Sequence, residues 1–282
     1  MLISCFIGAT TQEVPRDDAS AIVRRALIEN KRDLNVLRDY IYMSDGAVNT
    51  FDNSNNIVKT SSRKVENFYL DGSPYKRIVQ QDGKPLSEDQ RTKQERYLDN
   101  QIKDTVSASP KHKEDRERKA YKALEEDNVI REDIANGFIF TIIAEETRGG
   151  DRCIKLSAEP KEGFKGKSSL RALLPFLHGS IWIDVDKGQW MDIDATPITK
   201  VGAGITYLSD QSAIHLHQEP IRDNVWVITK EDFRLDARLF WDRKNVQVIK
   251  TYSDFKRFSS SVRVLAAEDG ASGQTQSEKI PK

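Results

Sequence analysis

The chain has 282 residues, with 44 basic and 44 acidic side chains, so its formal net charge at pH 7 is zero. This balance argues against a dedicated nucleic-acid-binding protein, which usually carries a basic excess. Charged residues make up 31% of the chain, and no apolar run approaches the roughly 20 residues that a membrane-spanning helix needs. Its two cysteines, Cys5 and Cys153, are too few for a disulfide scaffold or a four-cysteine zinc module.

The two ends of the chain differ from the rest in composition. Residues 1–15 begin with the apolar stretch Met1–Ala9, which resembles the apolar part of an export signal but has no Lys or Arg before it. We expect a signal-peptide remnant here, with a disordered stub as the alternative. Leu2-Ile3-Ser4-Cys5 also fits the last four positions of a bacterial lipobox, which would make Cys5 a lipidation site. Residues 265–282 are rich in small and polar residues and are expected to form a disordered tail.

The first elements predicted along the chain are one helix and three strands. A helix is expected over about 18–33, capped by Asp17 or Asp18. A strand over 36–43 is expected to end at an Asp45-Gly46 turn. Two further strands, 63–70 and 75–80, flank Asp71-Gly72, which is a strong hairpin signal.

A charged helical insert is predicted over 87–127, where half of the residues are charged and the signs alternate. Ser87 and Gln90 have the spacing of a helix capping box, and Pro110 separates the first helix from a second over about 112–127. The apolar stripe of the insert is narrow and consists of Tyr97, Leu98, Ile102, Val106, Tyr121 and Leu124. The insert is therefore expected to be a weakly held lid with a solvated outer face.

The second half of the chain reads almost entirely as strands. Phe138–Glu145 is apolar on both faces and is expected to be a central strand, and Ser168–His178 is expected to be a short helix. From Gly179 a meander follows, with strands expected at 225–229 and 233–241 among others. An antiparallel sheet of about ten strands must curl. The predicted fold class is therefore α+β: a large curled antiparallel sheet, or incomplete β-barrel, with helices on its concave face.

Several stretches of the sequence resemble one protein family. Asp71–Arg77 and Gln81–Ser87 look like a hairpin and helix start of that family, and Gly179–Asp184 looks like the opening of its second half-sheet. Tyr252–Phe258 is similar to its last strand. The family is that of the LolA/LolB-like outer-membrane lipoprotein-sorting proteins, which are lipoprotein carriers. The resemblance covers roughly 17–262 and implies one LolA-like half-barrel domain over 16–264.

This resemblance implies an exported bacterial envelope protein that binds lipid or acyl chains in a concave apolar cavity. It implies a location in the periplasm or at the outer-membrane periphery, with at most peripheral membrane contact. The implied partners are lipid or lipoprotein acyl chains and an envelope protein, and no nucleic acid. No enzymatic activity, catalytic residue or cofactor is expected. Burying an acyl chain gains about 0.8 kcal/mol per CH₂, which needs no reactive group in the cavity.

The candidate cavity residues come from strand alternation near the C-terminus. Phe233, Leu235, Leu239 and Trp241 share one face of the predicted strand, against charged residues on the other face. Val225 and Val227 are expected to add to this apolar face from a neighbouring strand. These faces are expected to turn toward the N-terminal helix and the helix predicted over 168–178.

Two alternative functions remain open. His215, His217 and Glu219 alternate along one strand and could hold a metal ion, which would suit a metal-dependent hydrolase. The competing interpretation is that they form a solvent-facing polar side opposite the core, with no metal. A non-catalytic envelope scaffold that acts through the charged helices is the second alternative. No Gly-x-Ser-x-Gly, His-Glu-x-x-His or phosphate-loop motif occurs in the sequence.

Overall fold

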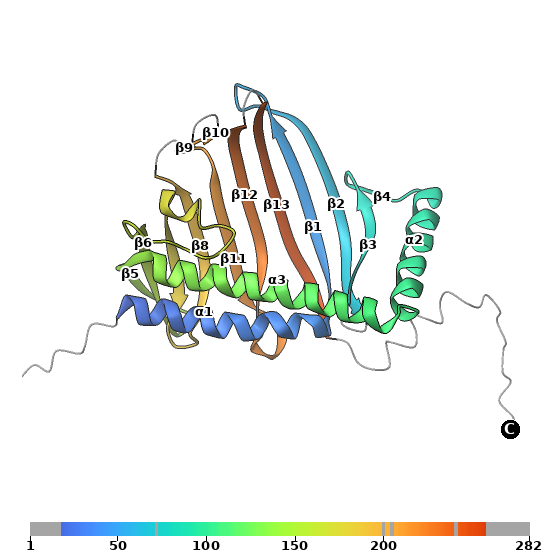
Figure 1. Cartoon of the computed structure of the whole chain (residues 1–282), viewed down its shortest axis with the longest axis horizontal. Coiled ribbons are helices and arrows are strands. Elements are labelled where there is room, and N and C mark those ends of the chain that lie inside the picture. Colours follow the sequence, from blue (N-terminus) through green and yellow to red (C-terminus); the bar gives the residue numbers. More distant parts are fainter. Residues whose placement is uncertain (1–17, 71–72, 199–200, 204–205, 240–241, 258–282) are drawn as a thin grey trace, which may run out of the picture.

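The structure is a computed structural model and describes residues 18–70, 73–198, 201–203, 206–239 and 242–257 (Figure 1). The predicted N-terminal stub with Cys5, the Asp71-Gly72 turn and the predicted C-terminal tail lie outside these ranges. Within them, no helix combines the length and apolar character needed to cross a membrane.

Strands of the described residues form one large antiparallel sheet. Their bounds are β1 Tyr40–Phe51, β2 Ile57–Leu70, β3 Ser73–Gln81, β4 Lys84–Pro85, β5 Phe138–Arg148, β6 Asp151–Pro160, β7 Leu177–Asp184, β8 Gln189–Pro197, β9 Val201–Ala203, β10 Thr206–Leu208, β11 Ala213–Pro220, β12 Trp226–Leu239 and β13 Asp242–Arg257. The order across the sheet is β4-β3-β2-β1-β13-β12-β11-β8-β7-β6-β5, and β10 and β9 continue it beside the end of β12. The sheet curls without closing, which confirms the predicted fold class (Figure 1).

Three α-helices of the described residues accompany the sheet, and side-chain caps fix where each begins. Asp18 caps α1 (Ala19–Val36) by accepting from the Ser20 amide at 3.0 Å. The predicted capping box of Ser87 and Gln90 is confirmed at the start of α2 (Glu88–Val106). Ser109 caps α3 (Pro110–Gly137). Helices α1 and α3 cross the concave face together, whereas α2 stands beside β3 and β4 at the edge (Figure 1).

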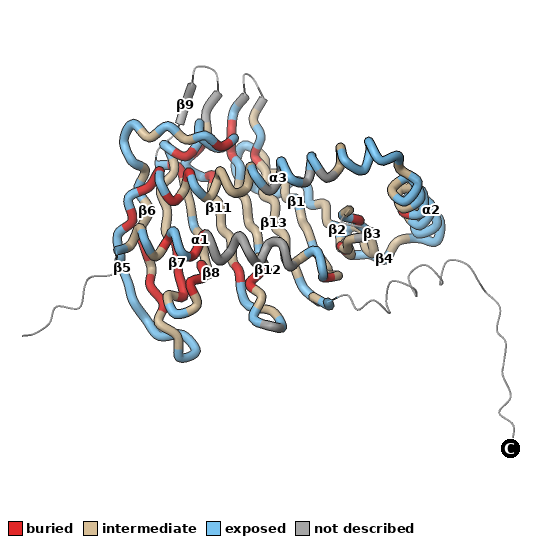
Figure 2. Tube along the Cα trace, turned by 60° about the horizontal axis from the view of Figure 1, so that its bottom comes forward, coloured by how far each residue is buried: buried red, intermediate tan, exposed pale blue. Residues whose placement is uncertain are grey.

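The hydrophobic core occupies one half of the concave face, between α1, the end of α3 and strands β5 to β8 (Figure 2). Its buried members are Val23, Ala26, Leu27, Ala135, Phe138, Phe140, Ile154, Leu156, Leu174, Ile181, Ile183 and Trp190. Each large apolar side chain buried here stabilises the fold by about 1.5–3 kcal/mol. The half of the sheet formed by β1, β2, β3 and β13 contributes none of these residues.

The expectation of a central strand over 138–145 is wrong, because β5 ends the strand order. Phe138 and Phe140 are buried in the core, but Ile139 and Ile143 are each 56% exposed. A run of β-branched residues favours a strand without specifying how many neighbours that strand has. Here α1 packs on one face of β5, and among the described strands only β6 pairs with it.

The predicted turn at Asp45-Gly46 is also wrong. The N-terminal helix continues to Val36, and β1 then runs without a turn from Tyr40 to Phe51. Gly46 lies opposite Lys250 of β13 and Arg63 of β2, so ladders on both sides hold the backbone extended. The second helix of the insert, predicted over 112–127, is longer than expected and continues as α3 to Gly137.

The helix predicted over Ser168–His178 is replaced by turns, a short 3₁₀ helix (Leu174–Phe176) and the start of β7. The Asp133 carboxylate accepts from the amides of Lys167 and Ser168 at 2.8 and 2.7 Å, which fixes an irregular loop. Pro175 also lacks the amide that an α-helix would use.

The two strands predicted at 225–229 and 233–241 form one strand, β12. Its pairing with β11 shifts register between His217 and Gln218, which marks a β-bulge near residue 229.

Candidate functional site

One row of cross-strand partners connects the core with the open half of the sheet. Partners in adjacent antiparallel strands carry their side chains on the same face. The row runs Leu156, Ile181, Ile193, Leu216, Glu231, Lys250, Gly46 and Arg63, from β6 to β2. Because Leu156 and Ile181 belong to the core under α1, the whole row lies on the concave face. Along it, apolar side chains give way to charged ones at β12.

A pocket of about 730 Å³ lies at the charged end of this face. Strands β1, β2, β3 and β13 form its floor, and Gln94 and Tyr97 of α2 form a wall. Its lining residues are Ser44, Gly46, Ala47, Val48, Thr50, Lys59, Ser61, Ser62, Arg63, Val65, Asn67, Lys76, Ile78, Gln94, Tyr97, Val248 and Lys250. This volume is within the range of roughly 300–1,000 Å³ that is usual for small-molecule sites.

The pocket is amphipathic. Its floor carries the apolar side chains of Val48, Val65, Ile78 and Val248. Gly46 leaves the centre of the floor open, and a Cβ added there would meet Lys250 Cγ at 3.6 Å, an ordinary contact distance. Apolar surface and polar groups are therefore both available to a bound molecule.

The charges that line the pocket are all positive and belong to Lys59, Arg63, Lys76 and Lys250. No carboxylate occurs among the described lining residues. Lys250 Nζ lies 3.3 Å from Glu231 Oε2, outside the lining. For the other three cations, the described part of the chain supplies no ion-pair partner within 4.0 Å.

An aromatic cluster adjoins the pocket on the same face, where Tyr252 pairs with Ser44. The ring of Tyr42 stacks on Phe255 with centroids 5.4 Å apart and meets the Tyr252 ring edge-on at 6.0 Å. Burial raises the pKa of Tyr42 to about 12 and also raises the pKa of Tyr252, to which nearby Glu231 contributes. The rings of this cluster add aromatic surface to the same face beside the pocket.

The candidate cavity residues lie on both faces of the sheet. Phe233 and Leu235 share the concave face with Val248 and Val246, and Leu235 is 42% exposed. The bulge in β12 reverses the alternation, so Val227 pairs with Glu219 and faces the same side as His217. Val225 precedes β12 and is half-buried. The side chain of Leu239 and all of Trp241 lie outside the described residues.

The pocket was missed from the sequence because it requires four strands and α2 to come together. The sequence signal was the alternation of Lys59, Ser61, Arg63, Val65 and Asn67, which places two cations on one face of β2.

The histidine pair lies on the convex face of the sheet. His215 Nδ1 lies 2.7 Å from Asp194 Oδ1, and His217 Nδ1 lies 2.7 Å from Asp192 Oδ1. Glu219 is 3.9 Å from the other ring nitrogen of His217. Each imidazole is thus hydrogen-bonded to its own aspartate. In the part of the chain that the structure describes, no group of three or more His, Cys, Asp and Glu side chains could hold a metal ion.

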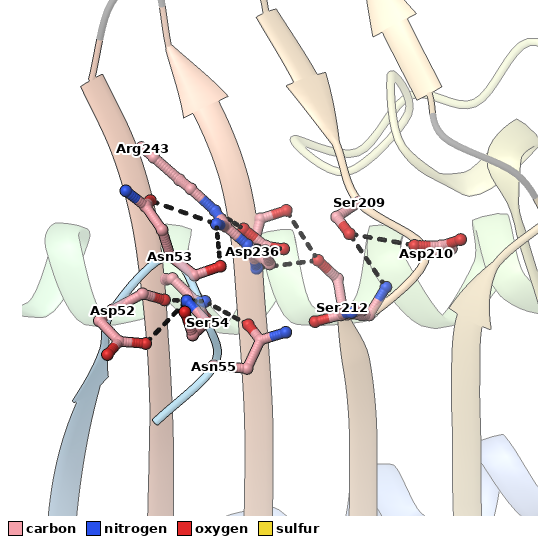
Figure 3. A network of polar contacts seen from close by, with 11 residues as sticks. Asp52, Asn53, Ser54, Asn55, Ser209, Asp210, Ser212, Asp236 and Arg243 are labelled. Carbon is pink, nitrogen blue, oxygen red and sulfur yellow. Dashed lines mark hydrogen bonds and ion pairs between the residues drawn. The ribbon is translucent and has the colours of Figure 1, made fainter. Parts of the chain in front are cut away.

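A polar network fixes the rim of the sheet where β12 and β13 meet (Figure 3). The buried carboxylate of Asp236 accepts from Nε and Nη2 of Arg243 at 2.7 and 2.8 Å. Arg243 also reaches the Asn53 carbonyl at 3.4 Å. Asp52 closes the same loop by accepting from the amides of Ser54 and Asn56. The network therefore holds the β1–β2 loop, whose flanking residues Thr50 and Lys59 line the pocket.

Several solved structures are similar to this chain. No protein-family model and no curated protein sequence matches it. A DUF1329 family protein from Desulfovibrio piger aligns with 14% identity and a TM-score of 0.34, covering 87% of this chain and 95% of its own. A LolA superfamily protein from Nitrosomonas europaea aligns with 7% identity and a TM-score of 0.29, covering 87% of this chain and 96% of its own. A putative outer membrane lipoprotein-sorting protein domain from Vibrio parahaemolyticus aligns with 9% identity and a TM-score of 0.35, covering 84% of this chain and 94% of its own. Two of these three proteins are described as LolA superfamily or outer membrane lipoprotein-sorting proteins, the family that stretches of this sequence resemble.

Proposed function

We propose that this chain is a non-enzymatic envelope protein that binds a lipid or acyl chain in the pocket of its concave face. The observation that carries the proposal is the pocket itself, which lies on the part of the curled sheet that the core leaves open. Its apolar floor can bury methylene groups at about 0.8 kcal/mol each. The pocket lies beside α2, which packs on β3 as the nearest helix of the predicted insert.

Of the predicted ligand contacts, Phe233 and Leu235 lie on the concave face and belong to this proposal, and Leu239, Trp241 and Val225 stay predictions. Val227 faces the convex side, away from the pocket. Phe233 supports the proposal most directly, because it is the concave-face partner of Val248, which lines the pocket. A long acyl chain that starts in the pocket would reach β12 along this row.

The binding test fills the pocket floor without disturbing the strand. Gly46→Val places a branched side chain between Lys250 and Arg63, where a Cβ meets its neighbours at ordinary distances. Asp45→Val adds the same side chain one residue away, on the exposed opposite face. Binding is measured by the fluorescence of the uncharged apolar probe N-phenyl-1-naphthylamine and by its displacement with long-chain lipids.

We expect the wild type and Asp45→Val to bind the probe and Gly46→Val to bind it at least tenfold more weakly. Circular dichroism shows whether both variants keep their strands. Failure of folded wild-type protein to bind any acyl compound would refute the proposed function, and unchanged binding by folded Gly46→Val would place the ligand elsewhere.

The proposed location is the periplasm or the outer-membrane periphery, with an envelope protein as a further partner. Fusion of the gene, together with the sequence upstream of it, to a reporter that is active only in the periplasm should give signal. Activity from a cytoplasm-only reporter instead would contradict the location.

A further inference from the structure

We infer that the pocket selects amphiphiles with an anionic head group, a carboxylate or a phosphate, and that Arg63 binds that group. This inference rests on the proposed function and specifies its ligand class. It follows from the distribution of charge around the pocket and from the position of Arg63 within it.

The positive lining does not reflect the composition of the chain. The formal net charge of the whole protein is zero. On β3, Arg77 forms an ion pair with Glu66, while the neighbouring Lys76 faces the pocket without such a partner among the described residues. On β3, the charge of Arg77 is therefore balanced by Glu66, whereas the charge of Lys76, which faces the pocket, has no such balancing carboxylate among the described residues. An anion entering the pocket would supply the missing charge.

Arg63 is the central cation of the set. It lies next to Gly46 in the row whose next member is Lys250. Lys59 is four residues away along β2, or about 13 Å at the usual rise of a strand. Lys76 pairs with Asn67, four residues away in the other direction. The three lysines therefore surround Arg63 on the face where Gly46 leaves space.

The chemistry of Arg63 suits a planar or tetrahedral anion. A guanidinium can donate two parallel hydrogen bonds to a carboxylate or phosphate. Ser61 lines the pocket two residues along the same face and supplies a hydroxyl donor. Val65, two residues in the other direction, supplies apolar contact for the adjoining chain. Head group and acyl chain can thus both be bound from one strand.

The test compares ligands of equal chain length: dodecyl phosphate and dodecanoate, each below its critical micelle concentration, and uncharged dodecanol, below its solubility limit. Each displaces N-phenyl-1-naphthylamine from wild type, Arg63→Gln and Lys64→Gln. Lys64 is the matched control, since it is the next residue on β2 and points to the opposite face. Inorganic phosphate alone is titrated by calorimetry to separate a lipid head group from free phosphate.

We expect the two anionic ligands to bind at least tenfold more tightly than dodecanol, with an advantage that decreases at high salt. Arg63→Gln should reduce their affinity roughly tenfold and leave dodecanol unchanged, and Lys64→Gln should change neither. Equal binding of anionic and uncharged ligands, or an equal loss for both in Arg63→Gln, would overturn the inference and leave the lipid-binding proposal standing. If no acyl ligand binds, both fall. Inorganic phosphate binding as tightly as dodecyl phosphate would indicate a phosphate site and overturn the lipid assignment.

Discussion

Asp236 shows how a single residue ties the pocket's supporting loop to the rest of the sheet. Its position in an alternating run of charged and apolar residues predicts a solvent-facing side chain, yet it is only 3% exposed. Arg243 donates two hydrogen bonds to the carboxylate and also reaches the loop that joins β1 and β2. The two hydrogen bonds from Arg243 to the carboxylate are the main cause that lowers the pKa of Asp236 below its usual value.

Replacing this carboxylate should make stability less dependent on pH. A carboxyl group whose pKa is lower in the folded state stabilises the fold fully above its unfolded pKa of about 3.9, and loses that contribution as the pH falls through the folded value. Asp236→Asn should therefore lower the free energy of unfolding by about 1.5–3 kcal/mol at pH 7. The difference from wild type should shrink below pH 4.

Urea denaturation between pH 3 and pH 7 measures this difference. Asp45→Asn, at an exposed position of β1, is the control and should change stability little at any pH. A deficit of Asp236→Asn that stays constant over the whole range would show that the ionised carboxylate is not the stabilising group.

At the scale of elements, the structural features that depend on residues close together in the chain could be predicted from the sequence. Those that depend on contacts between distant parts of the chain could not. The capping box of Ser87 and Gln90 depends on residues three apart, and the structure confirms it. The edge position of β5 depends on the order of all the strands. The face presented by Val227 depends on a bulge against β11. The pocket also depends on distant contacts, since it requires the register of β1 with both β2 and β13.

Helix α2 should be among the least stable elements that surround the pocket. Its one buried residue among those described is Leu98, while Tyr97 and Val106 are 57% and 62% exposed. Hydrogen exchange should show the amides of residues 88–106 opening far faster than those of β6, which has a paired strand on each side. This would fit a lid that admits a ligand.

Ser87→Ala provides a graded test of the same element. Loss of the cap should destabilise α2 by about 1 kcal/mol and accelerate exchange within residues 88–106, with β6 unaffected. Equal protection of α2 and β6 in the wild type would show that α2 is a rigid part of the fold and would exclude the lid.

At the scale of the whole molecule, one sheet face serves two purposes. Its β5–β8 half is covered by α1 and α3 and forms the core, whereas its β1–β3 and β13 half carries the pocket. The change falls at β11 and β12, where Leu216 pairs with Glu231. Curling gives such a wide sheet enough concave surface for both.

Matched leucine truncations on the two halves should separate stability from binding. Leu156 is fully buried in the core, and Leu235 is 42% exposed beside the pocket half. Leu156→Ala should lower the free energy of unfolding by about 2–5 kcal/mol. The removed methyl groups lose their burial, and the cavity they leave adds a further cost. Leu235→Ala should lower the free energy of unfolding by about 1 kcal/mol or less, because a large part of that side chain is already exposed in the free protein. In binding, the order should reverse: Leu235→Ala weakens lipid binding, while folded Leu156→Ala retains it.

Urea denaturation and probe displacement on the same samples measure both quantities. A cost for Leu235→Ala as large as that for Leu156→Ala would show that the second half is also packed core, and the division of the face would be wrong.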